Sequence, residues 1–306
     1  MNNTITNLID NIPPPRYVET IHIVCDSGAY NGGYLYGMLL YMKKLESKKY
    51  IKIDKISGSS VGSMLGVFYI LNKLSSIYSY MNKLCNCYRR SHCLKDFETL
   101  LHELMEHLDE NDYKKLNNKM FINYYDVKEC KEIVQSTYTS NKDIENYILN
   151  STFIPFFMNG NYSRDGKIDA TTPYIFNNRT MDDTKILFFR LTQYGKLKNM
   201  FHIRGELNLE QRIIEGILDV HTFYMKNEST IFCSWVNKWT LRDYIVYRFR
   251  RMLWLCIVLI LYIYNNYKSY CPSFITTKIQ SNRLFSLILE HLTYLYKDLF
   301  VLFYNS

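Results

Sequence analysis

Residues 50–74 read YIKIDKISGSSVGSMLGVFYILNKL, and this stretch decides the fold. Side chains alternate between apolar and polar from Tyr50 to Ser57, which predicts a strand, and the apolar run from Ser63 to Leu74 predicts a helix. Between them, residues 58–62 form a G-x-S-x-G pattern. A serine on such a strand-to-helix turn is strained and exposes its hydroxyl at the carboxyl end of the strand. Ser60 is therefore the candidate nucleophile.

The preceding residues repeat the same order of elements. Residues 20–25 (TIHIVC) predict a buried strand, residues 26–33 (DSGAYNGG) a glycine-rich turn, and residues 34–46 a helix. A strand–helix–strand–helix order with crossovers of this length predicts a parallel sheet. Residues 186–191 (ILFFRL) predict a third strand. The expected class is therefore α/β.

The rest of the chain is expected to be mainly helical. Residues 75–150 have a mostly helical pattern, and Asn159-Gly160 predicts a two-residue hairpin turn. Asn208 is a suitable cap for a helix that runs to about Met225, and the remainder is apolar and basic. We therefore expect three parts, which are a polar tail over residues 1–18, a core over 19–200 and a helical region over 201–306.

Composition and charge limit the classes of function. The chain has 306 residues, of which 47% are hydrophobic and 22% charged, as in globular proteins rather than disordered ones. The formal net charge of +8 favours an anionic partner such as a lipid surface or a nucleic acid. No zinc finger, helix-turn-helix signature or RNA-binding aromatic strand motif is visible in the sequence. A nucleic acid is therefore not the expected partner.

No metal site or secretory signal is expected. The chain has 8 cysteines at irregular spacing, and Cys85, Cys87, His92 and Cys93 lack the paired C-x-x-C pattern of a zinc site. The polar residues 1–15 contain no apolar core of a signal peptide, which predicts an intracellular protein.

Residues 252–264 (MLWLCIVLILYIY) are strongly apolar, with arginines before them and aromatic residues near their ends. As a helix this segment would be about 20 Å long, short of the roughly 30 Å hydrocarbon core of a bilayer. Three interpretations stay open, which are a buried core helix, a membrane-associated interfacial helix and a membrane span.

Four motifs in order resemble those of one enzyme family. Ser27-Gly-Ala-Tyr-Asn-Gly32 stands where that family has a glycine-rich oxyanion motif, and Gly58-Ser-Ser60-Val-Gly62 matches its nucleophile motif. Residues 151–155 (STFIP) resemble the segment before its aspartate loop, and Tyr162-Ser-Arg-Asp165-Gly166 resembles the loop itself. Over residues 20–195 the chain thus resembles the patatin-like phospholipases. The resemblance implies a three-layer fold with a mostly parallel central sheet, flanking helices and a largely helical C-terminal region.

The resemblance also implies chemistry. It makes the protein a serine-dependent carboxylic ester hydrolase of phospholipase or lipase type that acts on acyl lipids and needs no cofactor or metal. Ser60 and Asp165 would form a dyad that works through an acyl-serine intermediate. Backbone amides at Gly28 and Ala29, with Asn31 and Gly32 beside them, would stabilise the oxyanion.

Three positions depart from the family pattern, and the first is Ala29, where the family has a glycine. Asn31 stands where the family has an arginine, and Lys167 follows Asp165-Gly166 where the family has a small residue. Lys167 either supplies the missing positive charge or distorts the aspartate loop. The alternative function is therefore a catalytically impaired patatin-like protein that binds membranes or acts as a scaffold.

Overall fold

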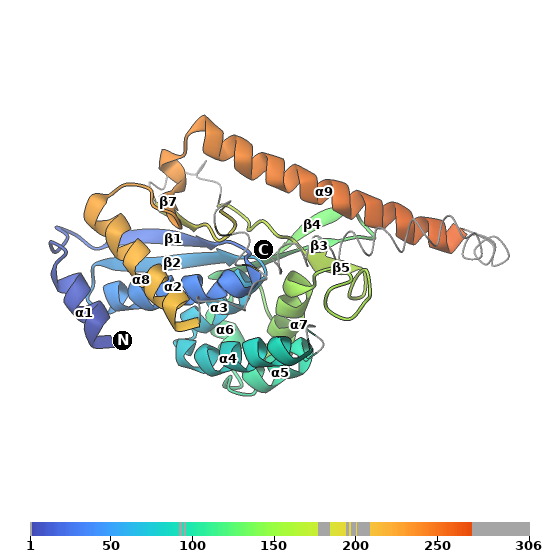
Figure 1. The fold of residues 1–306 in the computed structure, drawn as a ribbon, viewed down its shortest axis with the longest axis horizontal. Helices are drawn as coiled ribbons and strands as arrows, with labels where there is room; N and C mark the ends of the chain where they lie inside the picture. Colours follow the sequence, from blue (N-terminus) through green and yellow to red (C-terminus); the bar gives the residue numbers. More distant parts are fainter. Residues whose placement is uncertain are drawn as a thin grey trace.

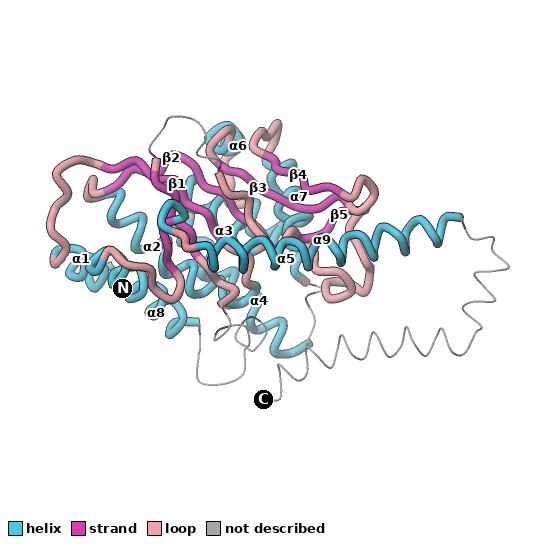
Figure 2. The backbone as a smooth tube through the Cα atoms, turned by 90° about the horizontal axis from the view of Figure 1, so that it is seen from above, coloured by secondary structure: helices cyan, strands magenta, loops and turns pink. Residues whose placement is uncertain are grey.

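The chain folds around one mixed sheet, shown in Figures 1 and 2. The computed structural model describes residues 2–91, 94, 96–176, 184–193, 196, 200 and 209–270. In the described part, the sheet has seven strands. Six of them pair in the order β4-β3-β2-β1-β6-β7, and the seventh, β5, pairs with β3. They are β1 (Glu19–Cys25), β2 (Ile51–Gly58), β3 (Met120–Asp126), β4 (Lys131–Gln135), β5 (Lys167–Asp169), β6 (Lys185–Phe189) and β7 (Cys233–Trp235).

The directions of the strands confirm the predicted α/β class. The four central strands β3, β2, β1 and β6 run parallel, while β4, β5 and β7 pair antiparallel with their neighbours. Parallel neighbours require crossover connections, which here are the helices between them. The carboxyl ends of β1 and β2 therefore lie at the same edge of the sheet.

The helices cover the two faces of the sheet unequally. Figures 1 and 2 show α2, α3 and α8 on one face and the long helix α9 across the other. The described helices are α1 (Asn2–Asp10), α2 (Gly32–Ser47), α3 (Val61–Ile70), α4 (Leu74–Ser91), α5 (Phe97–Met105), α6 (Asp112–Leu116), α7 (Asn141–Thr152), α8 (Leu209–Lys226) and α9 (Leu241–Tyr270), with the short 3-10 helices η1 (Ala29–Asn31) and η4 (Val236–Lys238).

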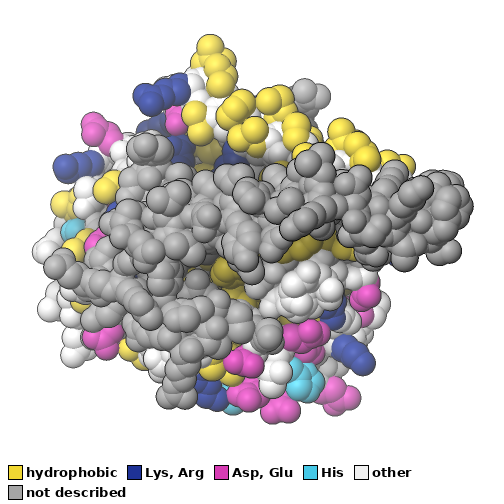
Figure 3. Space-filling model, turned by 45° about the vertical axis from the view of Figure 1, so that its right-hand side comes forward, with side chains coloured by type: hydrophobic (Ala, Val, Ile, Leu, Met, Phe, Trp, Pro, Cys, Tyr) yellow, Lys and Arg dark blue, Asp and Glu magenta, His cyan; other side chains and the backbone are white. Residues whose placement is uncertain are grey.

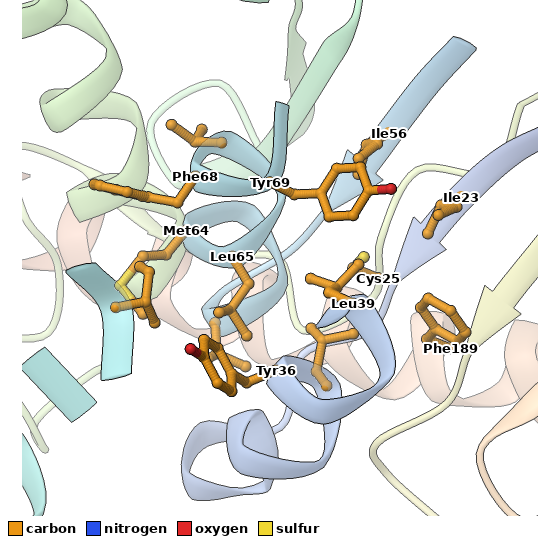
Figure 4. Close-up of a cluster of buried hydrophobic side chains, with 14 of the residues drawn as sticks. Ile23, Cys25, Tyr36, Leu39, Ile56, Met64, Leu65, Phe68, Tyr69 and Phe189 are labelled. Atoms are coloured by element: carbon orange, nitrogen blue, oxygen red, sulfur yellow. The ribbon is translucent and has the colours of Figure 1, made fainter. Parts of the chain in front are cut away.

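The main hydrophobic core lies between the sheet and the α2–α3 layer. Ile23 and Cys25 of β1 point into it together with Ile56 of β2, and Leu39 and Leu65 reach it from the helices (Figure 4). A smaller cluster on the opposite face contains Val24, Ile186 and Phe188. Because successive side chains of a strand point to opposite faces, the consecutive buried residues Ile23, Val24 and Cys25 fit a strand that is covered on both sides at this end.

Two glycines bring α2 and α8 into close contact. A Cβ on Gly37 would lie 2.0 Å from the backbone oxygen of Ile213, and a Cβ on Gly216 would lie 2.1 Å from that of Tyr34. Only glycine fits at a crossing of this kind, since any side chain would collide with backbone atoms of the partner helix. The crossing places the start of α8 beside the turn that follows β1.

The structure differs from the sequence-based expectations at several elements. Residues 75–150 contain the strands β3 and β4, and the expected N-terminal tail contains α1, whose Ile5 and Ile9 are buried. No strands flank Asn159-Gly160, which lies in a turn, so the predicted hairpin is wrong. The region after residue 200 is not a separate unit, because β7 pairs with β6. The predicted cap Asn208 lies outside the described residues.

Candidate functional site

Ser60 lies on a strained turn between β2 and α3. Its φ is 55° and its ψ is −127°, a backbone conformation that residues other than glycine rarely adopt. A Cβ on Gly58 would lie 2.4 Å from the Gly62 oxygen, and a Cβ on Gly62 would lie 2.5 Å from the Cys25 oxygen. Both glycines are therefore needed for β2 to turn into α3 so sharply. This geometry is the one expected of a nucleophile elbow.

Neighbouring side chains hold the turn in place. The backbone N–H of Ser60 donates to Ser151 Oγ over 2.9 Å, and Ser63 Oγ donates to the backbone oxygen of Ser60 over 2.6 Å. Ser151 lies in the last turn of α7 and belongs to the segment in which the sequence resembles the patatin-like family. It thus connects the serine turn to the segment that leads to β5.

The carboxylate at Ser60 belongs to Asp169. Its side chain is buried and lies close enough to Ser60 for that hydroxyl to lower the pKa of the carboxyl. Asp169 Oδ1 accepts from Ser59 Oγ over 3.1 Å and from the Thr171 N–H over 3.0 Å. Ser60 and Asp169 therefore form a hydroxyl–carboxylate dyad, and Ser59 holds the carboxylate from the adjacent position.

The strand register explains why Asp169 occupies this place. β2 ends where Gly58 pairs with Ile122 of β3. β4 occupies the other edge of β3, so β5 continues along the edge that β2 leaves, with Asp169 opposite Tyr124. Asp169 thus lies two residues along β3 from the partner of Gly58, and the serines that follow Gly58 meet its side chain.

This arrangement corrects the expected pairing of Ser60 with Asp165. Asp165 is exposed and lies in the turn before β5, with a φ of 53°, and Gly166 follows with a φ of 82°. Arg164 and Lys167 close this turn with backbone hydrogen bonds of 2.9 and 2.8 Å in both directions. Two central residues with positive φ are typical of a tight hairpin turn, for which Asp-Gly is a common sequence. Asp165-Gly166 therefore reverses the chain and lies at the far end of β5 from Ser60.

Lys167 does not take the place of the missing family arginine. Its Nζ lies 2.5 Å from Asp126 Oδ2, at the end of β5 away from Asp169. The ion pair and backbone hydrogen bonds to Asp126 hold the pKa of that carboxyl below its ordinary value, although burial opposes them. Lys167 thus pairs with Asp126 at the end of β5 that is farther from Asp169.

The glycine-rich turn after β1 lies beside Ser60. Ala29 has a φ of 45° and lines the same cavity as Ser60. A Cβ on Gly28 would lie 2.6 Å from Leu191 Cβ, and one on Gly32 would lie 2.5 Å from Val61 Cγ2, so both positions require a small residue. Asn31 is buried and its Nδ2 donates to the Leu191 and Lys196 oxygens over 2.9 and 3.0 Å. Asn31 therefore ties this turn to the segment after β6 and does not line the cavity.

A cavity of about 380 Å³ opens at Ser60. Most of its lining is apolar, with Met64 of α3, Met81 of α4 and Phe97 of α5 among the contributing residues. Among the described residues that line it, none is a histidine. A mainly apolar cavity next to a hydroxyl–carboxylate pair is suited to a ligand with an apolar chain.

A buried arginine also lines this cavity. Arg212 of α8 is only 4% exposed, and its Nη1 donates to the Tyr30 oxygen in η1 over 2.9 Å. The close α2–α8 crossing brings it there, so a cation reaches the turn after β1 from a distant part of the chain. Burial lowers the pKa of Arg212, but an arginine keeps its charge at neutral pH.

Burial controls the protonation of Asp169. It raises the pKa of this carboxyl from its ordinary 3.8 to about 6, although the Thr171 N–H, the hydroxyls of Ser60 and Ser59 and the charge of Arg250 act in the opposite direction. A carboxylate with such a pKa is a stronger base than an ordinary one and is ionised at pH 7.

Asp169 is the site residue that the sequence analysis missed. It is followed by Ala170 and Thr171, two small residues, with Pro173 beyond them. The family pattern has a small residue after its aspartate, a feature that Asp169-Ala170 shares. A second feature argues against Asp165, because Asp-Gly is a common sequence of tight hairpin turns.

Comparisons with protein-family models and with curated proteins find no match for this chain. Among the described residues, no group of three or more His, Cys, Asp or Glu side chains is placed to hold a metal ion. His92 and Cys93 of the candidate cluster lie outside the described residues.

Proposed function

We propose that this protein is a serine-dependent carboxylic ester hydrolase of the patatin-like type that cleaves acyl lipids. One observation carries the proposal: Ser60 lies on a strained turn, lines an apolar cavity and is next to the buried carboxylate of Asp169. The parallel sheet supports it, since ligands of such sheets bind beyond the carboxyl ends of the strands.

The chemistry follows from the positions of these groups. Asp169 accepts the Ser60 proton as Oγ attacks the ester carbonyl, and the tetrahedral oxyanion is stabilised by backbone N–H groups of Gly28 and Ala29. Asp169 then returns the proton to the departing alcohol, which leaves an acyl-serine. Water, deprotonated by Asp169, attacks the acyl group and releases the fatty acid and free Ser60.

The cavity indicates the substrate class. Its apolar lining fits an acyl chain, and Arg212 lines it together with the acidic Glu210. A buried guanidinium forms strong charge-assisted hydrogen bonds with phosphate oxygens. A glycerophospholipid, which combines acyl chains with a phosphate, therefore fits the site better than a neutral ester.

The test is hydrolysis of labelled phospholipids by the wild type and three variants. Ser60→Ala and Asp169→Asn are expected to lose at least about 10³-fold of the activity, because each removes one member of the dyad. Asp165→Asn is the matched control, since it makes the same chemical change four residues away at an exposed turn, and it should leave turnover unchanged.

A fluorophosphonate probe distinguishes the enzyme from the scaffold alternative. Labelling that Ser60→Ala abolishes supports the hydrolase, while a folded wild type that is neither labelled nor active supports the membrane-binding scaffold. Loss of activity in Asp165→Asn together with an active Asp169→Asn would contradict the dyad proposed here.

We also propose that α9 meets an anionic lipid surface. Its outward side carries exposed large apolar residues, including Ile245, Phe249, Met252, Ile260 and Ile263. Figure 3 shows hydrophobic side chains along the upper edge of the molecule, where α9 lies. In the described part of the chain, none of the helices combines the length and the apolar character that a membrane span needs. The sequence also allows residues 252–264 to be interpreted as a buried core helix. That interpretation is wrong for their outward side, which is exposed, but it holds for Val258 and Leu261, which are buried.

Charge favours a lipid surface over a second copy of the chain as the occupant. Within α9 the basic residues Arg242 and Arg248 are exposed, whereas Arg250 and Arg251 form ion pairs with Asp26 and Glu132, and Asp243 forms one with Arg190. Two such helices placed against each other would bring like charges together, whereas anionic headgroups attract them. An apolar face with flanking arginines is typical of an interfacial helix.

A further inference from the structure

The inward side of α9 reaches both loops of the candidate site. Trp254 Nε1 donates to the backbone oxygen of Asp169 over 2.7 Å, and the Tyr247 hydroxyl donates to the backbone oxygen of Pro173 over 2.7 Å. Both acceptors belong to the segment that carries the dyad carboxylate. The helix with the exposed apolar face is therefore bonded directly to the backbone of the site from the opposite face of the sheet.

Arg250 joins this segment to the turn after β1. Its guanidinium donates to both carboxylate oxygens of Asp26, over 2.6 and 3.0 Å, and to Ser27 Oγ over 3.1 Å. It also donates to the Thr171 oxygen, two residues after Asp169. One side chain thus contacts the beginning of the glycine-rich turn and the loop that follows the dyad aspartate.

Asp26 makes this connection rigid. It is fully buried and accepts hydrogen bonds from the backbone N–H groups of Ser27, Leu191 and Thr192 over 3.0, 3.1 and 3.3 Å. A buried carboxylate without its cation is strongly unfavourable, so the Asp26–Arg250 pair keeps α9 and the turn after β1 in one relative position. Neither Asp26 nor Arg250 lines the cavity.

We propose that Arg250 is a positioning residue that aligns the turn at Ser27–Ala29 with the loop at Asp169–Thr171, so that the seating of α9 controls the geometry of the site. The catalytic part of this inference rests on the proposed function, and the structural part does not. Because α9 also carries the apolar face, contact with a lipid surface would act on the same helix that aligns the site.

The groups that surround Asp169 predict a second effect of Arg250. They are the hydroxyls of Ser59 and Ser60, the Thr171 N–H, the guanidinium of Arg250 and, paired with it, the carboxylate of Asp26. The ion pair of Lys167 with Asp126 lies at the other end of β5. Arg250 lowers the pKa of Asp169, so its removal would raise that pKa and move the acidic limb of a pH–rate profile to higher pH.

The experiment compares Arg250→Met and Arg250→Lys with the matched control Arg248→Met, which removes an exposed arginine from the same helix. Trp254→Phe is a milder variant, since it keeps an aromatic ring but removes the N–H donor to the backbone oxygen of Asp169. Each full-length protein is measured by hydrogen exchange in peptides that cover residues 20–33 and 167–175. The rate of Ser60 labelling by a fluorophosphonate is measured from pH 5 to 9, a range that contains the titration of Asp169 near pH 6 and its expected upward shift.

Arg250→Met is expected to raise exchange in both peptides, to slow labelling at least about tenfold and to move its acidic limb upward, because small displacements in a site have large kinetic costs. Arg250→Lys should recover part of each effect, Trp254→Phe should affect the 167–175 peptide alone, and Arg248→Met should match the wild type. Unchanged exchange in Arg250→Met would overturn the inference. Increased exchange in a protein whose wild type is never labelled would keep the positioning role and reject the proposed function.

Discussion

Asp169 carries a carboxylate in a place that disfavours its charge. Burial raises its pKa to about 6, against an ordinary 3.8, so the folded protein prefers the protonated form more than the unfolded chain does. The contribution of this residue to stability is therefore present below the unfolded pKa and is lost as the pH rises through the folded pKa. At pH 7 the cost is about 3 kcal/mol, since each pKa unit corresponds to about 1.4 kcal/mol.

Asp169→Asn should therefore stabilise the fold while it abolishes catalysis. We expect the free energy of unfolding to rise by up to about 3 kcal/mol at pH 7, with the gain vanishing near pH 4, because the native carboxyl is protonated there. Urea unfolding at the two pH values measures it. Asp165→Asn, at an exposed turn, should show no comparable difference, and an Asp169→Asn protein that is less stable at pH 7 would contradict the argument.

Arg212 gives a prediction about substrate choice. Arg212→Met is expected to raise KM for an anionic phospholipid about tenfold or more relative to a neutral ester with the same acyl chain, since a charge-assisted hydrogen bond contributes about 1.5–3 kcal/mol. Arg212→Lys should keep part of the preference because it keeps the charge. An equal loss on both substrates would instead assign Arg212 to its contact with the Tyr30 oxygen alone.

Single residues also show where prediction from sequence ends. Ser60 could be predicted because the glycines around it leave few other structures for that turn. Asp169 could not, because its role depends on the place that β5 takes along β3, and that register is set by contacts between residues about 45 positions apart. Asp165-Gly166 offered a familiar motif whose physical cause is a tight turn.

The β2–α3 turn gives a prediction at the scale of the element. Gly62→Ala should destabilise the fold by about 1–3 kcal/mol or more, because its Cβ would lie 2.5 Å from the Cys25 oxygen and 2.8 Å from the Asp26 oxygen, both backbone atoms. Gly160→Ala is the control, since nothing lies within 4 Å of its Cβ and only its φ of 82° opposes the change. Urea unfolding of the two variants should separate them, and equal losses would show that the close approach is not limiting.

The elements that were predicted correctly have strong local patterns. Such patterns of apolar residues predict the strands β1 and β2 and the helices α2, α3 and α8. β3 has the sequence MFINYYD, in which both faces are largely buried and the alternation disappears. β7 has three residues and exists through its pairing with β6. Such strands depend on tertiary contacts that no local window contains.

At the scale of the whole molecule, contacts across the expected division near residue 200 join the region beyond it to the sheet. Strand signals stop there in the sequence, yet α8 packs on α2 through the Gly37 and Gly216 contacts, and α9 bonds to the site loops. Two arginines come from the region beyond residue 200: Arg212, which lines the cavity, and Arg250, which contacts the loops on the other side of the site. The candidate site is thus completed by a part of the chain that the resemblance did not cover.

The outward face of α9 gives a prediction for the molecule as a whole. Ile245→Asp combined with Ile260→Asp should weaken binding to anionic vesicles at least about tenfold, because both side chains are more than half exposed and charge opposes their entry into lipid. Ile214→Asp on α8, where the original side chain is 50% exposed, is the matched control. Co-sedimentation with phosphatidylserine vesicles measures binding, and hydrolysis is measured on the same vesicles and on a dispersed short-chain ester.

The two substrates separate docking from chemistry. If α9 brings the protein to lipid, the double variant should lose hydrolysis on vesicles and keep it on the dispersed ester, because the dyad and the cavity are unchanged. Losses on both substrates would mean that the substitutions displaced α9 from Asp26 and Asp169, as the contacts of Arg250 and Trp254 allow. Unchanged binding in the double variant would remove α9 as the lipid-facing surface, and self-association of the wild type that the double variant abolishes would assign the face to a second copy instead.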